Sequence, residues 1–333
     1  MGRARRGLNA REPAATPMPT THTLDCETVH YEWNNALVPR LEIEPGDTVV
    51  FDTRDSADGY YRPASSHADV LARGPFRGHP LTGPVRVNGA RPGDVLVVEI
   101  VEVRPRASFG WTAIRPGRGL LPEAEFAKPF LQIWDLADGT HARMGHGIAV
   151  PIEPFPGVMG TALDEPGRHS TMPPRKNGGN MDVKHLVAGT TLYLPVWVDG
   201  ALFSVGDAHA AQGDGEVCVT AVEMVARVTL RFDLQPRRAL KEPQLRTRGP
   251  LAAGTNHGPF FATTAHGPDL FAAAQQAVRY MIDHLVTERG LSREEAYILS
   301  SVAVDLKISE IVDTPNWIVS AFLPESVFTQ RAR

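Results

Sequence analysis

The chain has 333 residues, which is enough for two domains of ordinary size. Hydrophobic residues make up 42% of it and charged residues 22%, so the composition is that of a globular protein and excludes general disorder. The formal net charge of -4 reflects 34 Lys and Arg against 38 Asp and Glu. So close a balance gives no overall field that would attract nucleic acid or an anionic membrane.

Glycine and proline are in excess. The chain contains 30 Gly and 28 Pro, together about one residue in six, where average usage is roughly 12%. Because both residue types interrupt helices and favour turns, this excess argues against a helical bundle or a coiled coil. We expect many short elements joined by turns.

The two cysteines, Cys26 and Cys218, lie far apart in the sequence, which excludes a disulfide framework and a cysteine metal cluster. We expect both to be thiols in the reducing cytoplasm. No apolar run approaches the roughly 20 residues of a membrane span. Residues 1–20 are rich in arginine and have no apolar stretch of the kind that a secretory signal carries, so we expect a disordered N-terminal arm.

One sequence pattern occurs three times between residues 21 and 234. A Pro-Gly pair, or a single Gly in the third copy, separates short runs rich in Val, Leu and Ile. Pro presets the first position of a type II turn and Gly supplies the positive φ of the next, so each copy predicts two strands and a turn. The copies are residues 41–51, 87–100 and 186–196.

A hairpin and a further strand follow. Residues 201–205 predict a strand, 206–215 a long polar turn, and 216–223 a second, alternating strand. Residues 227–234 alternate cleanly, with apolar side chains at every second position. We therefore expect residues 21–234 to form a mainly β body, like a sandwich or barrel.

The pattern becomes helical after residue 268. An apolar stripe at three- and four-residue spacing predicts a helix capped by Asp269 and ended by Gly290, and Ser292 begins a capping-box sequence for a second helix. Residues 306–312 and 317–323 predict two more strands. Residues 235–333 are therefore expected to form a mixed α/β part packed on the body.

Ligand-type side chains gather in the polar loops. The segment from Gly206 to Glu216 holds Asp207, His209, Asp214 and Glu216 among small residues, which would let the backbone approach a ligand closely. Carboxylates and imidazole are ligands of zinc, manganese or calcium. The alternative is an ordinary hairpin turn with carboxylates bonded to nearby amides, although His209 is harder to explain in that way.

Other loops offer similar groups, each with a plain structural alternative. Asn180 and Asp182 follow two glycines and could form an Asx turn. His79 precedes a proline and could be an ordinary loop histidine. Asp55 follows a predicted strand and could cap a turn. The sequence lacks a glycine-rich nucleotide loop and a Gly-x-Ser-x-Gly elbow, and Cys218 lies within a predicted strand, away from any activating helix N-terminus.

These segments resemble the acetamidase/formamidase family over nearly the whole chain. The matching stretches are residues 30–55, 79–100, 156–160, 178–217 and 305–324. The sequence departs from the family pattern at Asn34, at residues 56–60 and at His79.

The resemblance implies hydrolysis of a short aliphatic amide to carboxylate and ammonia by a cytoplasmic homo-oligomer, with no nucleic-acid or membrane partner. Together with the ligand types, it also leads us to expect a divalent metal, zinc first and calcium or manganese as alternatives. The expected metal ligands are Asp55, Asp182 and His209. Glu216 is expected to act as acid and base with Asp207 orienting the reactants, and the expected substrate-binding residues are Asn180, His79 and Gln212.

Two other functions stay open at this point. One is a metal-dependent hydrolase of another C–N bond, such as that of urea, guanidine or a larger amide. The other is a β-sandwich that binds calcium and a ligand without catalysis.

Overall fold

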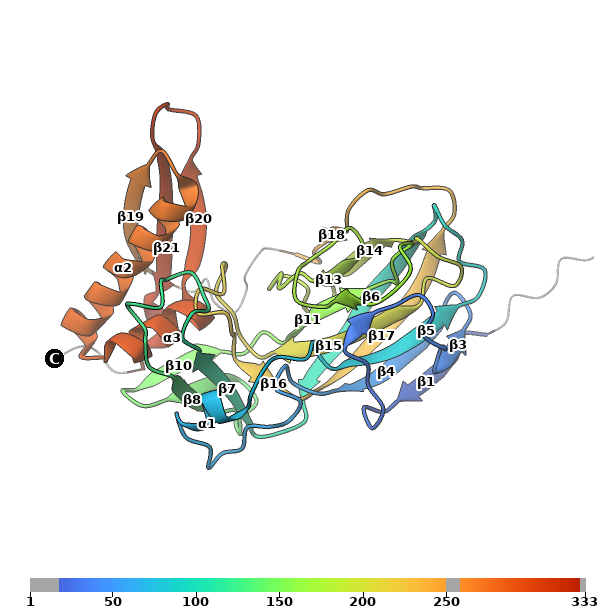
Figure 1. Ribbon diagram of the computed structural model, residues 1–333, viewed down its shortest axis with the longest axis horizontal. Coiled ribbons are helices and arrows are strands. Elements are labelled where there is room, and N and C mark those ends of the chain that lie inside the picture. Colours follow the sequence, from blue (N-terminus) through green and yellow to red (C-terminus); the bar gives the residue numbers. More distant parts are fainter. Residues whose placement is uncertain (1–17, 250–257, 330–333) are drawn as a thin grey trace, which may run out of the picture.

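The computed structural model describes residues 18–249 and 258–329, so most of the expected N-terminal arm lies outside the described residues. A β-rich body and a C-terminal unit of helices and strands stand side by side (Figure 1). This confirms a mainly β fold, sandwich-like in layout, with a mixed α/β C-terminal part.

One layer of the body is a six-stranded sheet. Its order is β1 (Thr21–Leu24), β4 (Thr48–Thr53), β17 (Ala226–Gln235), β6 (Val95–Pro105), β14 (Thr191–Pro195) and β18 (Gln244–Arg246). The predicted alternation in β17 is confirmed, because Val228, Leu230 and Phe232 are buried and the residues between them face outward. The pairing of β18 with β14 extends this sheet past residue 234, into residues that we had assigned to the C-terminal part.

The second layer is a ten-stranded sheet. Its main path is β10 (Ile148–Pro151), β9 (His141–Met144), β8 (Phe130–Asp135), β7 (Phe109–Ile114), β16 (Glu223–Met224), β15 (Phe203–His209), β11 (Phe155–Gly160) and β13 (Gly178–Asn180). Strand β5 (Leu81–Val87) also pairs with β15 and with β3 (Leu41–Ile43). Strands β2 (Glu32–Trp33) and β12 (His169–Ser170) form a separate pair. Strand β15 is buried along its whole length, so the side chains at its end project into the interior.

Aromatic side chains join the two layers. Phe51 of β4 and Phe232 of β17 meet Phe203 of β15, with ring centroids 6.1 and 5.0 Å apart. The rings are tilted or edge-on, which is the favoured arrangement of aromatic pairs. These three residues belong to one large apolar core that continues under the C-terminal unit.

The two Pro-Gly-Asp turns share one structure. Gly46 and Gly93 have φ of 100° and 90°, as the turn prediction required. In both turns the aspartate side chain also accepts a hydrogen bond from the amide three residues earlier, at 3.0 Å for Asp47 and 2.9 Å for Asp94. The carboxylate therefore closes the turn that the Pro-Gly pair begins.

Asp47→Ala should destabilise the body. The Asp47 carboxylate is buried and accepts from the amides of Thr20 and Glu44, which would lose their partner. We expect a loss of about 1–3 kcal/mol in the free energy of unfolding, measured by urea denaturation. Glu42→Ala, an exposed change on the neighbouring strand, is the control; equal stability of the two variants would contradict the role of Asp47.

The predicted hairpin at residues 201–223 is wrong in its second half. Strand β15 extends to His209, and residues 210–222 form a loop before the short β16. Glu216 and Val219 have φ of 43° and 73°, values that a continuous strand cannot contain. The alternating pattern reflects burial of the loop against other elements rather than a strand.

The C-terminal unit follows its prediction closely. Strands β19 (Phe260–Gly267), β21 (Trp317–Pro324) and β20 (Asp305–Glu310) form a sheet that packs with α2 (Leu270–Arg289). Helix α3 (Arg293–Ala303) follows, and the short α1 (Asp69–Ala72) and η1 (Glu325–Val327) lie elsewhere. Asp269 caps α2, Gly290 ends it with φ 68°, and Ser292 with Glu295 forms the predicted capping box.

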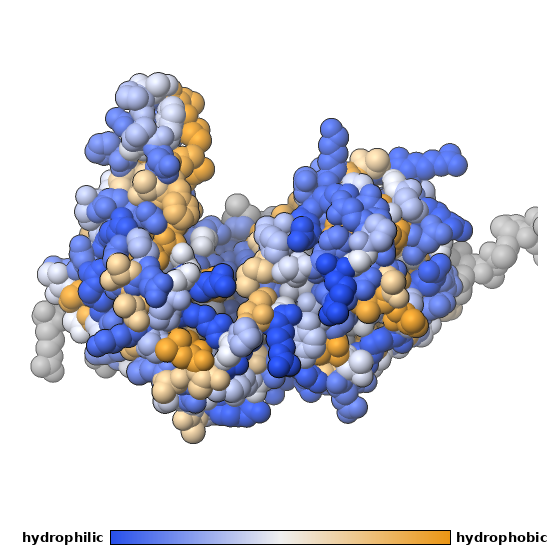
Figure 2. All heavy atoms as spheres, in the orientation of Figure 1, coloured by the Kyte–Doolittle hydropathy of each residue, from blue (hydrophilic) through white to orange (hydrophobic). Residues whose placement is uncertain are grey.

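The described helices include none that is long and apolar enough to cross a membrane. Hydrophilic side chains cover most of the face in Figure 2, while hydrophobic ones follow the edge of the C-terminal unit that β20 forms in Figure 1. Ile308, Ile311 and Val312 are exposed in and after this strand.

Candidate active site

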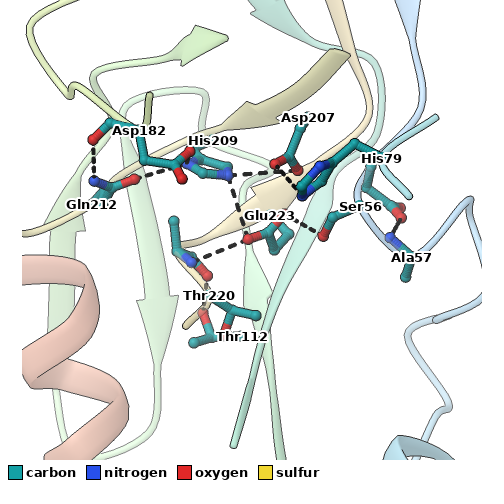
Figure 3. A network of polar contacts seen from close by, with 12 residues as sticks. Ser56, Ala57, His79, Thr112, Asp182, Asp207, His209, Gln212, Thr220 and Glu223 are labelled. Atoms are coloured by element: carbon teal, nitrogen blue, oxygen red, sulfur yellow. Dashed lines mark hydrogen bonds and ion pairs between the residues drawn. The ribbon is translucent and has the colours of Figure 1, made fainter. Parts of the chain in front are cut away.

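The candidate site lies where the end of β15 meets its neighbours. Strand β15 supplies Asp207 and His209, and β16 places Glu223 directly opposite His209 in the antiparallel pair. The loop before β5 brings His79, and the turn after β13 brings Asp182 (Figure 3). Four segments that are distant in the sequence therefore contribute to one polar cluster.

Gln212 fixes the orientation of His209. The Gln212 amide nitrogen donates to the carbonyl of Asp182 at 2.7 Å, so its oxygen faces Nδ1 of His209, 2.9 Å away. Because a carbonyl oxygen only accepts, Nδ1 carries a hydrogen and donates it. In the neutral ring, Nε2 then presents its lone pair to the cluster.

The Nε2 atom of His209 faces two carboxylates. It lies 3.6 Å from Oδ1 of Asp207 and 3.4 Å from Oε1 of Glu223, beyond the usual N–H···O distance. Within the described part of the chain, Nε2 of His209 and Oδ1 of Asp207 and Asp182 are buried atoms without a hydrogen-bond partner. Ligand-type atoms of these three residues lie within 4.8 Å of one another, and so do those of His209, Glu216 and Glu223.

The outer atoms of the cluster are held in place. His79 is bonded through its amide and its Nδ1 to the hydroxyl of Thr171, and its Nε2 lies 3.5 Å from Asp207. Glu223 accepts from the hydroxyl of Ser56 at 2.7 Å and from the amide of Ala221 at 3.1 Å (Figure 3). These contacts fix the directions in which the charged groups point.

Burial and the charges of neighbouring groups give the carboxyl groups and His209 different pKa values. Burial and the charge of Asp207 raise the pKa of Asp182 and of Glu223 to about 7, although His209 acts in the opposite direction on both. Burial acts in the same direction on Asp207, but His79 and His209 outweigh it and hold its pKa well below the usual range. Burial would lower the pKa of His209, yet Glu223 and Asp207 raise it well above its ordinary value. Asp207 is thus the anionic member of the cluster, while its neighbours can hold protons near neutral pH.

Glu216 is positioned by the C-terminal unit. Its loop is bonded to α3, because Ser301 accepts from the amide of Cys218 at 3.1 Å and donates to the carbonyl of Thr220 at 2.8 Å. The hydroxyl of Tyr297 donates to the carbonyl of Val217. Burial and the neighbouring Asp182 raise the pKa of Glu216 well above its ordinary value.

Backbone strain is concentrated at the site. Asp182, Asp207 and Glu216 have φ of 47°, 52° and 43°, in the left-handed region that L-residues seldom occupy. Such strain costs about 1–3 kcal/mol per residue and persists only where surrounding contacts impose it. Here it turns three carboxylates toward one cavity.

Gly157 allows the close approach of these groups. A Cβ built at this position would lie 2.5 Å from Oδ1 of Asp182 and 2.9 Å from Cε1 of His209. Both distances are far inside van der Waals contact, so only glycine fits. This gives a physical reason for the glycine in the 156–160 stretch.

The cluster forms one wall of a cavity of about 430 Å³. Among the expected site residues, the structure brings His79, Asn180, Asp182, Asp207 and Glu216 to this wall. His209 and Gln212 lie buried directly behind it.

Asp55 departs from its expected place among the metal ligands. Its Oδ1 accepts from the amides of Ala57 and Gly59, at 2.8 and 3.1 Å, and so caps the turn after β4. It does not belong to either set of converging ligand atoms found among the described residues. The turn-capping alternative describes its contacts.

Glu223 and Ser56 were missing from the expected site. Glu223 ends the run that we took for a strand, and the pairing of β15 with β16 puts it beside His209. The predicted hairpin could not show this contact, because it placed His209 in the turn and Glu223 at the far end of the second strand. Ser56 gave no sequence signal, because its role depends on the contact with Glu223.

Comparison with known proteins identifies the family. The model of the acetamidase/formamidase family matches residues 19–169 and 164–330. A formamidase of Methylophilus methylotrophus is 27% identical over 90% of this chain and 89% of its own length. An acetamidase of Mycolicibacterium smegmatis is 27% identical over 62% of this chain and 65% of its own length.

Two solved structures extend the similarity. An acetamidase from Bacillus halodurans is 34% identical, with a TM-score of 0.64 over 92% of this chain and 98% of the other. A gamma lactamase from Delftia acidovorans is 26% identical, with a TM-score of 0.85 over 93% and 94%. The mainly β fold, the buried acid–imidazole site and these matches define an amide hydrolase. The chain belongs to the acetamidase/formamidase family, whose members are hydrolases of C–N bonds in linear amides.

Gly157→Ala should impair the site more than the fold. The added methyl must displace Asp182 or His209, so we expect amide hydrolysis to fall by about 100-fold, as misplacement of reacting groups by about 1 Å does. Initial rates of ammonia release, with thermal unfolding as a fold check, measure this. Gly145→Ala, at a position with open space around it, is the matched control; full activity of Gly157→Ala would contradict the role of the close approach.

Proposed function

We propose that this chain hydrolyses short aliphatic amides of the formamide or acetamide type to a carboxylate and ammonia, with the help of a divalent cation. The observation that carries the proposal is the convergence of Asp182, Asp207 and Glu216 on one cavity, with His209 buried beside them. The formamidase and acetamidase among the relatives support this substrate class.

The donor set fits a divalent cation. Buried, unpartnered Nε2 of His209 and Oδ1 of Asp207 and Asp182 would hold it, with Glu223 close to the same imidazole. An imidazole nitrogen with carboxylate oxygens is a ligand set that zinc accepts, and manganese is the alternative. When bound, the cation would supply a polarised amide carbonyl and a water of lowered pKa.

Gln212 and His79 would act as positioning residues rather than substrate ligands. Gln212 holds the His209 ring in the tautomer that presents Nε2, and His79 keeps Asp207 ionised. Both side chains are buried and already engaged by neighbours. These contacts support a positioning role for the two residues that we first expected to bind substrate.

Asn180 would bind the substrate amide. Its Nδ2 donates to the carbonyl of Met172 at 3.1 Å, which leaves Oδ1 as a buried acceptor without a partner among residues 18–249 and 258–329. An acceptor on the cavity wall can take an N–H of a primary amide. A substrate bound in this way would give Asn180 Oδ1 the hydrogen bond that it lacks, and a buried acceptor without such a bond costs free energy.

Glu216 would move the proton. As a carboxylate it takes a proton from the attacking water, whose oxygen forms a bond to the carbonyl carbon. It then delivers that proton to the nitrogen as the C–N bond breaks, so that ammonia and the carboxylic acid form, and the acid passes its proton to ammonia or to water. Its place on the cavity wall and its raised pKa suit a group that must both accept and return a proton.

Glu216→Gln should abolish most turnover. The amide side chain keeps the shape but cannot accept the proton, so we expect kcat to fall by about 10²–10⁴-fold, measured as ammonia release from formamide and acetamide. Glu42→Gln, on an exposed strand position, is the control. A Glu216→Gln enzyme with unchanged kcat on every amide would exclude Glu216 as the acid and base.

Removal of the cation should abolish activity reversibly. We expect dialysis against a chelator to stop turnover and zinc or manganese to restore it, with about one equivalent of metal found by elemental analysis of the purified protein. Asp207→Asn should lower the metal content.

Full turnover by metal-free protein would contradict the metal-assisted mechanism. Thermal stability that depends on metal, without turnover of any amide, would favour a binding protein over an enzyme.

Homo-oligomerisation and a cytoplasmic location remain expectations for this chain. The exposed apolar side chains along β20 would be one surface on which copies could associate.

A further inference from the structure

Three arginines share the cavity with the carboxylates of the site. Arg73 follows α1, and Arg115 and Arg118 lie in the turn after β7. All three side chains line the same cavity as Asp182, Asp207, Glu216 and Glu223. One cavity is therefore lined by both carboxylate and guanidinium groups.

We propose that the substrate of this enzyme is an amide that also carries an anionic group, a carboxylate in the first instance, and that Arg73, Arg115 and Arg118 bind that group. This inference rests on the proposed amidase function and names its substrate class. The natural substrate would then be the monoamide of a short dicarboxylic acid.

The three cavity arginines have no carboxylate partner among the described residues. Several arginines elsewhere are paired with carboxylates, as Arg54 is with Asp58 at 2.8 Å and Arg227 with Asp52 at 2.9 Å. Across residues 18–249 and 258–329, the three cavity arginines form no ion pair within 4.0 Å. Guanidinium groups that face a cavity without an anion are available to one that enters it.

Arg73 and Arg115 are held in place by hydrogen bonds that leave most of their N–H groups unused. Nη2 of Arg73 donates to the carbonyl of Ser56 at 2.5 Å, and Nη2 of Arg115 donates to the carbonyls of Val70 and Gly74 at 3.1 and 3.0 Å. A guanidinium has five N–H donors, so most remain free. Because the hydroxyl of Ser56 also donates to Glu223, Arg73 is only one residue removed from the reacting cluster.

The size and lining of the cavity agree with a longer substrate. Its volume of about 430 Å³ falls within the range that suits ligands much larger than acetamide. Tyr61, Phe76 and Trp111 also line it, which suits a short hydrocarbon chain between the two polar ends. Burial lowers the pKa of Arg73, and a bound anion would offset that loss of solvation.

Another explanation is that the arginines only compensate the charge of the acidic cluster. In that case their loss would weaken the hydrolysis of every amide equally. Binding of a substrate carboxylate instead predicts that the loss falls on anionic amides. The ratio of kcat/KM between anionic and neutral amides of equal length separates the two explanations.

The test uses matched pairs of amides: succinamate against butanamide, and glutaramate against pentanamide. We expect the wild type to favour the anionic member by about tenfold or more, the worth of a charge-assisted hydrogen bond. Arg73→Gln should reduce this ratio by about tenfold and Arg118→Gln by about three- to fivefold, while Arg118→Lys should retain most of it. Arg246→Gln, on the exposed strand β18, is the matched control and should leave the ratio unchanged.

Three results would overturn the proposal. A wild type that hydrolyses formamide and favours the neutral amides contradicts the anionic substrate but leaves the proposed function intact. Arginine variants that lose activity equally on both members of a pair support charge compensation instead. A purified, metal-loaded protein that hydrolyses no amide of either kind refutes the proposed function itself, and the inference with it.

Discussion

Four carboxylates cannot all be ionised when they are gathered around one buried imidazole. Asp182, Asp207, Glu216 and Glu223 surround His209 in a space where burial alone raises the pKa of each carboxyl group. The surrounding structure gives these carboxyl groups different pKa values. His79 and His209 keep Asp207 anionic, while Asp182, Glu216 and Glu223 can hold protons. Strained backbone, a glycine without room for a methyl group and a fixed imidazole tautomer all serve to keep these groups together.

Much of the fold could be predicted because its signals are local. The Pro-Gly-Asp turns, the alternating strand β17 and the capping residues Asp269 and Ser292 each depend on neighbours within a few positions. The candidate loops were found for a similar reason, since Asp207, His209 and Gln212 follow one another along β15 and its end. Local chemistry thus indicated the loops that form the candidate site.

The rest depended on contacts between distant segments. Glu223 acquires its place only through the pairing of β15 with β16, and Asp55 loses its expected role to two amides of its own turn. Residues 216–222 alternate like a strand, yet α3 holds them in a loop. The three arginines that line the cavity come from two separate turns, so their spacing in the sequence gave no sign that they share one site.

The attachment of the Glu216 loop to the C-terminal unit bears on how the protein matures. Val217 is bonded to a residue 80 positions later, Cys218 to one 83 positions later and Asp214 to one 91 positions later. During synthesis the strands of the body are made before those partners. The acidic and imidazole groups on the strands can therefore assemble first, and the Glu216 loop gains its attachment only afterwards. Such an order would leave the cavity without one of its carboxylates until the end of the chain has been made.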